Sequence, residues 1–212
     1  MQSEKTTRIY ILRHGESLGN FNKECLGHTD KDLTEKGVRQ AQATADFLSE
    51  ICFAGVYSSD LIRAYNTALP HARLRGFEVV TLPSLRELYF GDWEGMRVAD
   101  ITEIYGEMFT VGWRQGFGTF TPPAGEYVQD CADRMYKTIL GLAEEHPGGN
   151  ILVASHAAAI RALWGRLLGL EPDEVCAAIS FPLNASFSVA ELCDGVLRPV
   201  SYSNGDHLLG VE

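Results

Sequence analysis

Signatures of metal and nucleotide binding are missing from this sequence. Its six histidines form no His-x-x-x-His or His-x-x-Glu-His pair, and its five cysteines form no Cys-x-x-Cys pair. Neither Gly-x-Gly-x-x-Gly nor a Walker A sequence occurs. Zinc, redox, dinucleotide and P-loop sites are built on these local patterns. We therefore expect an activity that needs no metal and no cofactor.

Positive charge is also scarce in this chain. Lys and Arg total 18 residues against 28 Asp and Glu, which gives a formal net charge of −10. Nucleic acids and anionic membranes are bound chiefly by clustered Lys and Arg, so we expect neither as a partner. Any phosphate must bind in a local positive pocket of an acidic protein.

A long hydrophobic run is absent near the N-terminus. Residues 1–7 are polar, and the apolar run behind them stops at Arg13, which is too soon for a signal peptide or a membrane span. The odd, scattered set of cysteines is typical of reduced thiols. These features predict a cytoplasmic protein.

The sequence does contain β-prone runs that alternate with helical patterns. Its 212 residues suffice for one well-filled core, so we expect a single domain over residues 1–212. Thr34 is the expected N-cap of the first long helix, and Pro70 is expected to bend or end the next one. Strands are expected at residues 9–12, 53–58, 77–82 and 150–155, with a hairpin at residues 185–202. The pattern predicts an α/β domain.

Two of the expected strands end on a histidine. Residues 9–12 lead into Arg13-His14-Gly15, and residues 150–155 lead into His156. Open α/β sheets bind ligands beyond the carboxyl ends of their strands. We therefore expect both imidazoles to belong to one site, with Gly15 allowing a tight turn beside it.

Arg63 falls in the first turn of the helix that Ser59 and Asp60 are expected to cap. The helix dipole disfavours a cation at this position, which indicates a nearby anion. A phosphate there would also meet free backbone N–H groups. A surface ion pair between Asp60 and Arg63 is the alternative explanation.

Further motifs follow the Arg-His-Gly-Glu sequence of residues 13–16. They lie at residues 58–64, 85–87, 91–95 and 153–156. In this order and at these intervals, the set resembles the histidine phosphatase superfamily, also called phosphoglycerate-mutase-like, over nearly the whole chain. The resemblance implies a three-layer α/β/α sandwich with a mostly parallel, mixed central sheet.

The resemblance also implies roles for individual residues. His14 would be the nucleophile that becomes phosphohistidine, and Glu87 would be the proton donor and acceptor. An imidazole has a reference pKa of about 6.5, so it is largely neutral at neutral pH and attacks without a separate base. The residues implied to hold the phosphoryl group or the substrate are Arg13, Asn20, Arg63, His156 and Ala157.

Two of these residues have structural alternatives. Asn20 could support its turn through an Asx-type bond instead of donating to a phosphoryl oxygen. Glu87 could pair with Arg86 or cap a turn. A neighbouring aromatic environment would instead favour a protonated carboxyl group, as a general acid requires.

The residues that follow Glu87 indicate which branch of the family the chain resembles. Cofactor-dependent mutases usually carry an Arg-His-Tyr-Gly element there and an Arg-Arg pair further on. Here residues 87–95 read Glu-Leu-Tyr-Phe-Gly-Asp-Trp-Glu-Gly, with single arginines at Arg97 and Arg114. This is similar to the broad-specificity phosphatase branch, so we predict hydrolysis of small phosphate esters. Phosphoglycerate mutase and a non-catalytic, phosphate-binding regulatory protein are the alternatives.

Residues 96–125 form an irregular segment that we expect to roof the pocket. Its aromatics either line an apolar substrate cleft or form a small satellite core; they are Phe109, Trp113, Phe117 and Phe120. The tail at residues 203–212 could also cover the pocket. The identity of the substrate and the oligomeric state, a homodimer included, stay open.

Overall fold

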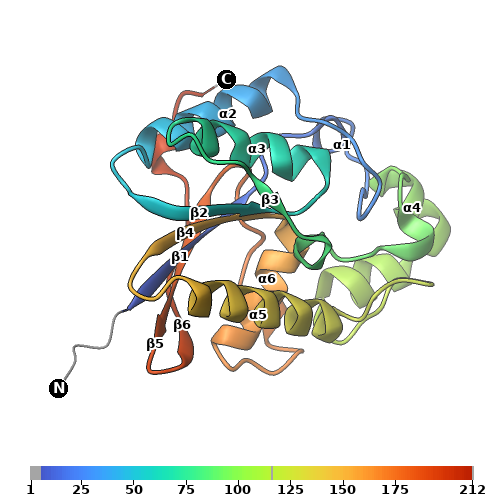
Figure 1. Cartoon of the computed structure of the whole chain (residues 1–212). Coiled ribbons are helices and arrows are strands. Elements are labelled where there is room, and N and C mark those ends of the chain that lie inside the picture. Colours follow the sequence, from blue (N-terminus) through green and yellow to red (C-terminus); the bar gives the residue numbers. More distant parts are fainter. Residues whose placement is uncertain (1–5, 116, 212) are drawn as a thin grey trace.

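A six-stranded mixed sheet forms the centre of the molecule (Figure 1). The computed structural model describes residues 6–115 and 117–211, so residues 1–5 of the polar N-terminus, residue 116 of the roof and residue 212 of the tail lie outside the described residues. The strands are β1 (Thr7–Arg13), β2 (Phe53–Ser58), β3 (Val80–Thr81), β4 (Asn150–Ser155), β5 (Phe187–Cys193) and β6 (Val196–Asn204).

The strand order is β3-β2-β4-β1-β5-β6. Strands β3, β2, β4 and β1 are parallel to one another, whereas β5 is antiparallel to both β1 and β6. The β5–β6 pair is the expected hairpin. Its two strands run slightly past the expected range, to Cys193 and Asn204.

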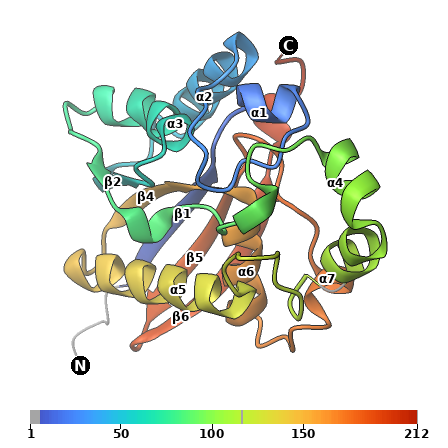
Figure 2. The same ribbon diagram turned by 90° about the vertical axis from the view of Figure 1, so that its right-hand side faces the viewer.

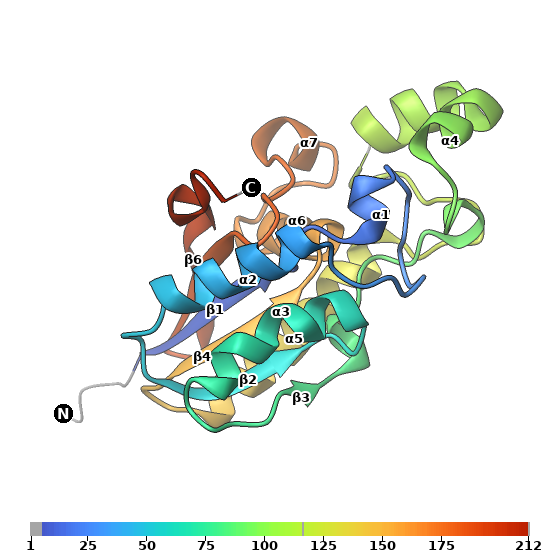
Figure 3. The ribbon, with the colours of Figure 1, turned by 90° about the horizontal axis from the view of Figure 1, so that it is seen from above.

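Helices cover both faces of the sheet and confirm the three-layer architecture (Figures 1 and 3). Helices α2 (Glu35–Phe47) and α3 (Ile62–Arg73) lie on one face, and α5 (Val128–Glu145) and α6 (Ala157–Leu167) lie on the other. Three shorter helices, α1 (Leu18–Phe21), α4 (Val98–Tyr105) and α7 (Val175–Ala178), gather at one end of the molecule (Figure 2). A π-helical turn, Met108–Trp113, follows α4.

The central strand β1 supplies side chains to two cores. Ile9 and Ile11 are fully buried in the cluster beneath α5 and α6, whereas Tyr10 and Leu12 join the cluster beneath α2 and α3. Successive strand residues point to opposite faces of a sheet. An uninterrupted apolar run was therefore the correct signal for a strand covered on both sides.

The sequence predicted some ends of helices and strands correctly and others wrongly. Thr34 caps α2 as expected, because its side chain accepts a hydrogen bond from the Gly37 amide at 3.0 Å. Pro70 does not end α3, which continues to Arg73. The strand expected at residues 77–82 is reduced to Val80–Thr81, because the Phe77 amide donates to the Ala72 carbonyl at the end of α3.

The described part of the C-terminal tail lies on α2. His207 Nε2 is 2.9 Å from Thr44 Oγ1, and its ring stacks on Phe47 with centroids 4.8 Å apart. Across the described ranges, no helix combines the length and the apolar character needed to cross a bilayer.

Candidate active site

The parallel register of β1 and β4 brings His14 and His156 together. Arg13 pairs with Ser155, and the His14 amide donates to the Ser155 carbonyl at 3.0 Å. The residues that follow each strand therefore lie side by side, with ring centroids 5.2 Å apart. Both imidazoles are buried, as the two strand ends predicted.

The orientation of His14 is fixed by the turn behind it. Its Nδ1 lies 2.7 Å from the Gly15 carbonyl oxygen and donates to it in the corresponding tautomer. The Gly15 amide in turn donates to Thr67 Oγ1 at 3.0 Å. A Cβ on Gly15 would come within 2.5 Å of the Gly37 carbonyl oxygen, so this close approach of α2 requires glycine. In that tautomer Nε2 of His14 carries no proton and keeps its lone pair.

Arg63 is buried in the first turn of α3, and loop carbonyls anchor its terminal nitrogens. Its Nη1 donates to Thr29 at 2.9 Å and its Nη2 to Gly27 at 2.6 Å. Its Nε is buried without a partner. The guanidinium group is thus anchored at both terminal nitrogens while its Nε–H stays unpaired.

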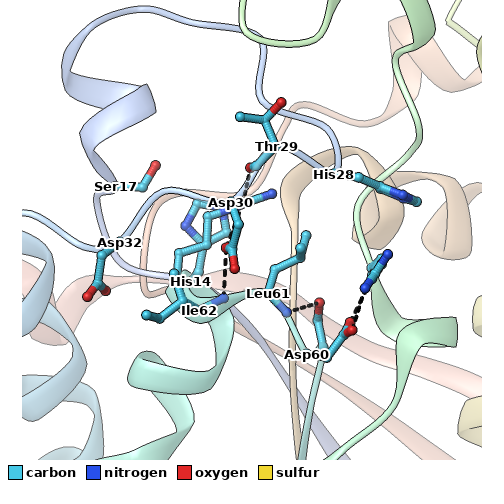
Figure 4. Close-up of polar contacts among 12 residues, drawn as sticks. His14, Ser17, His28, Thr29, Asp30, Asp32, Asp60, Leu61 and Ile62 are labelled. Carbon is cyan, nitrogen blue, oxygen red and sulfur yellow. Dashed lines mark hydrogen bonds and ion pairs between the residues drawn. The ribbon is translucent and has the colours of Figure 1, made fainter.

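The start of α3 is capped differently from the prediction. Asp30 Oδ1 accepts from the Ile62 amide at 2.9 Å (Figure 4) and lies 3.9 Å from Arg63 Nη1. Asp60 instead receives a hydrogen bond from Arg86 Nε at 2.7 Å. Ser59 contributes only one contact to the helix start, since its Oγ accepts from the amide of the N-cap residue Leu61 at 3.3 Å. The expected cap by Asp60 and the alternative Asp60–Arg63 ion pair are wrong, because a loop distant in sequence supplies the capping carboxylate.

Arg13 and His156 complete a group of buried donors that lack partners. Arg13 Nη1 donates to the Pro182 carbonyl, but its Nε has no partner. Both ring nitrogens of His156 are also unpartnered. Buried polar atoms are normally satisfied. Among the described residues, eight buried side-chain nitrogen and oxygen atoms are unpartnered, and four of them belong to Arg13, Arg63 and His156.

Asn20 serves the turn and also lines the cavity. Its Oδ1 accepts from the Ser17 amide and from Asn184 Nδ2, each at 3.1 Å. Asn184 also donates to the His14 carbonyl at 3.1 Å. Asn184 carried no signal in the sequence, because it lies in a loop 170 residues away from His14.

Glu87 contacts the beginning of α6. Its Oε1 accepts from the Ala159 amide at 2.8 Å, and its Oε2 accepts from the Ala158 amide at 3.2 Å. A carboxylate is favoured at this end of a helix by free N–H groups and by the dipole. Oε1 of Glu87 also accepts from the Leu88 amide of its own loop at 2.9 Å, so the alternative role as a turn cap is present as well. The alternative pairing with Arg86 is wrong, because Arg86 binds Asp60.

A cavity of about 290 Å³ joins these groups. Apart from His156, which lies fully buried, every residue proposed for the site from the sequence lines the cavity; these are Arg13, His14, Asn20, Arg63, Glu87 and Ala157. His28 does not line it, and its Nε2 lies 2.9 Å from the Glu87 carbonyl oxygen. No described residue of the tail contributes to the lining.

Burial and positive charge keep both imidazoles neutral. The pKa of His14 is held well below its ordinary value, first by burial and then by the nearby Arg63 and Arg13. Burial and Arg63 lower the pKa of His156 in the same direction. Burial also lowers the pKa of Arg13 to about 10, so this arginine stays charged at neutral pH.

The site therefore combines a neutral imidazole at His14 with fixed positive groups. In the part of the chain that the structure describes, no cluster of three or more His, Cys, Asp or Glu side chains could hold a metal ion. Fixed cations and N–H donors of this kind can stabilise the charge of a phosphoryl group during its transfer.

Known proteins are similar to this chain in sequence. A family model described as "Histidine phosphatase superfamily (branch 1)" matches residues 9–205. Adenosylcobalamin/alpha-ribazole phosphatase of Escherichia coli (strain K12) is 33% identical over 166 residues, covering 78% of this chain and 81% of that protein. The 2,3-bisphosphoglycerate-dependent phosphoglycerate mutase 2 of Gloeobacter violaceus is 31% identical over 209 residues, covering 90% and 94% respectively.

Solved structures are also similar to this chain. The structure of a mycobacterial glucosyl-3-phosphoglycerate phosphatase in complex with VO3 matches with a TM-score of 0.85 at 29% identity, and the match covers 93% of this chain and 98% of that one. Phosphatases and mutases thus both occur among the relatives.

Proposed function

The chain belongs to the histidine phosphatase superfamily, branch 1, and we propose that it hydrolyses small phosphomonoesters through a phosphohistidine on His14. One observation carries the proposal. Four unpartnered buried nitrogens, from Arg13, Arg63 and His156, belong to the same site as the free Nε2 of His14. A phosphoryl group placed there would accept from the two arginine Nε–H groups and from the one N–H of a neutral His156, which the protein itself leaves unpaired.

The first step forms the bond between His14 Nε2 and phosphorus while the ester P–O bond breaks. Glu87, in its protonated form, gives its proton to the departing alcohol oxygen. Arg13, Arg63 and His156 stabilise the charge on the phosphoryl oxygens. The proton on His14 Nδ1 stays on that nitrogen throughout and is donated in a hydrogen bond to the Gly15 carbonyl.

The second step releases inorganic phosphate. Glu87, now a carboxylate, takes a proton from the attacking water, and the oxygen of that water bonds to phosphorus as the bond to Nε2 breaks. His14 and the protonated Glu87 are thereby restored. No metal takes part in either step.

Charge in the lining favours hydrolysis over mutase activity. Among the described residues that line the cavity, Arg13 and Arg63 are the cationic ones, and the proposal uses both on the phosphoryl group. Arg97 and Arg114 are not in the lining, and Arg114 lies over the Phe109 ring at 5.3 Å. A mutase would need a further cation for the second anionic end of its substrate.

The test is phosphate release from a panel of phosphomonoesters in excess chelator. We expect release by the natural chain, competitive inhibition by vanadate, and a loss of at least about a thousandfold in His14→Ala. Thermal unfolding of His14→Ala should show an intact fold. Comparable release by this variant would refute the mechanism, and conversion of 3-phosphoglycerate to its 2-isomer would favour the mutase.

A further inference from the structure

We infer, on the basis of the proposed function, that the alcohol part of the substrate is an apolar, ring-sized group that bears no second negative charge. Much of the lining outside the phosphoryl-binding groups is apolar. It includes Leu26, Phe90, Val98, Phe109, Trp113 and Phe181. A volume of about 290 Å³ lies just below the range for small-molecule sites, roughly 300–1,000 Å³.

The aromatic wall is packed against further aromatic rings. Trp113 packs edge-to-face on Phe90 and Phe117, with ring centroids 5.1 and 4.9 Å apart. Phe120 stacks on the fully buried Trp93 at 5.7 Å. The roof aromatics therefore divide between both alternatives, since Phe109 and Trp113 line the cavity while Phe117 and Phe120 pack behind it.

Arg161 of α6 fixes the position of Phe181. Its guanidinium carbon lies 4.4 Å from the Phe181 ring centroid and 4.6 Å from that of Phe117. Phe181 is 42% exposed while Arg161 is buried, so this cation–π contact, together with the edge-to-face contact of Phe181 with Phe117 at 5.6 Å, holds an otherwise open side chain against the cavity. Arg161 is thus a positioning residue for the wall.

The charges of the lining oppose a substrate with two anionic ends. Once Arg13 and Arg63 bind the phosphoryl group, the lining offers no further cation among the described residues. The remaining carboxylate of the wall is Glu24, which forms an ion pair with Lys31. A second anion would therefore lose its hydration without gaining a free positive partner.

The test compares esters whose leaving alcohols have similar acidity. We expect kcat/KM for benzyl phosphate to exceed that for ethyl phosphate and for 3-phosphoglycerate by about tenfold or more, since each buried CH₂ contributes about 0.8 kcal/mol. Equal or greater kcat/KM for 3-phosphoglycerate would refute this inference. Failure to hydrolyse any ester would instead refute the proposed function, so the two failures are distinguishable.

Wall variants provide the second arm of the test. Trp113→Ala and Phe181→Ala should each lower the benzyl-to-ethyl ratio of kcat/KM about tenfold, and Arg161→Met should lower it through KM. Phe120→Leu, which alters the packing behind the wall, is the matched control and should leave the ratio unchanged. If the ratio were unchanged in the first three variants, Trp113 and Phe181 would not take part in substrate recognition, and the inference would be refuted.

A separate observation concerns the loop that carries Glu87. Arg134 of α5 donates from Nη1 to the Ser84 carbonyl at 2.9 Å and to the Arg86 carbonyl at 2.7 Å. Its Nη2 donates to the Glu87 carbonyl at 2.8 Å. Glu126 orients this guanidinium group through a fork, with its Oε1 2.7 Å from Nε and its Oε2 2.9 Å from Nη2.

The geometry points to Arg134 as the positioning residue of the proton donor. One planar guanidinium group holds three carbonyls of the loop, which a lysine cannot reproduce. Displacement of Glu87 should slow the hydrolysis of esters with poor leaving groups, because these alcohols must be protonated as they depart. It should have little effect on esters with good leaving groups. Arg134→Lys should therefore lower kcat/KM for benzyl phosphate about 10- to 100-fold and for 2,4-dinitrophenyl phosphate less than threefold.

The control for this experiment is Arg166→Lys, which alters an ion pair of α6 with Asp133 of α5. It should change neither substrate's kcat/KM. Equal losses on both esters in Arg134→Lys would show a purely structural role and overturn the inference. No loss on either ester would overturn it as well, provided that thermal unfolding shows a folded variant.

Discussion

His14 and His156 face each other across the junction of β1 and β4, with ring centroids 5.2 Å apart and the Arg63 guanidinium group close enough to lower both pKa values. The pair divides the work in the proposed reaction. His14 has one nitrogen engaged by the Gly15 carbonyl, whereas both nitrogens of His156 are unpartnered. Only His156 is therefore free to serve purely as a phosphoryl-binding group.

Replacement of His156 should weaken transition-state binding. We expect His156→Ala to lower kcat/KM for benzyl phosphate about 10²- to 10³-fold, as for the loss of one donor to a developing anion. His156→Gln, which keeps an N–H donor, should recover part of this loss. Steady-state kinetics with a thermal unfolding control measure both. A loss of less than threefold in His156→Ala would contradict the assigned role.

The acid side of the pH profile should reflect the lowered pKa of His14. Protonation removes the nucleophile, and burial together with Arg63 and Arg13 disfavours the protonated form. We expect kcat/KM, corrected for the second ionisation of the ester, to stay constant from pH 7 to below 6.5. In Arg63→Met the fall in kcat/KM that accompanies protonation of His14 should move to higher pH, because the variant lacks one positive charge that disfavours the protonated imidazole. Such a fall at or above pH 6.5 in the natural chain would contradict the prediction.

His71 should make the fold sensitive to acid. It is buried against Phe53, with Asp46 and His207 as its charged or titratable neighbours, and burial lowers its pKa to about 4. Between pH 6.5 and 4 the unfolded chain takes up a proton that the folded chain refuses, so stability falls as the pH drops, by about 1.4 kcal/mol per pH unit.

His71→Leu removes this proton uptake. When the pH is lowered from 7.5 to 5, the free energy of unfolding of the variant should therefore fall by about 2 kcal/mol less than that of the natural chain. Urea denaturation at both pH values measures this change. A difference between the two proteins that does not depend on pH would refute the link to His71.

The close contact of α2 with the His14 loop should not tolerate a methyl group. A Cβ on Gly37 would lie 2.0 Å from the Glu16 carbonyl oxygen, and overpacking of this kind costs about 1–3 kcal/mol. Gly37→Ala should lower the free energy of unfolding by that amount and also reduce activity. Gly141→Ala in α5, where a Cβ meets nothing within 4 Å, is the control and should raise stability by about 0.5–1 kcal/mol. Equal effects of the two substitutions would contradict this explanation.

The sequence by itself determined the features that depend on neighbours along the chain. The apolar runs before His14 and His156 identified two buried strands, and residue spacing identified the covering helices. Parallel strands present their carboxyl ends at one edge of a sheet, so these two histidines could be placed together without coordinates. Thr34 was recognised as a cap because capping is chemistry between residues three apart.

Tertiary structure alone decided the partners that come from distant segments. Asp30 caps α3, Asn184 holds the His14 carbonyl and Arg134 holds the Glu87 loop, although none of these contacts leaves a local pattern. The roof shows the same limit, since only packing settles which aromatic side chains face the cavity. Each of these contacts forms because the sheet and helices bring distant segments of the chain together. The number of residues between two segments does not determine how close they lie in the folded structure.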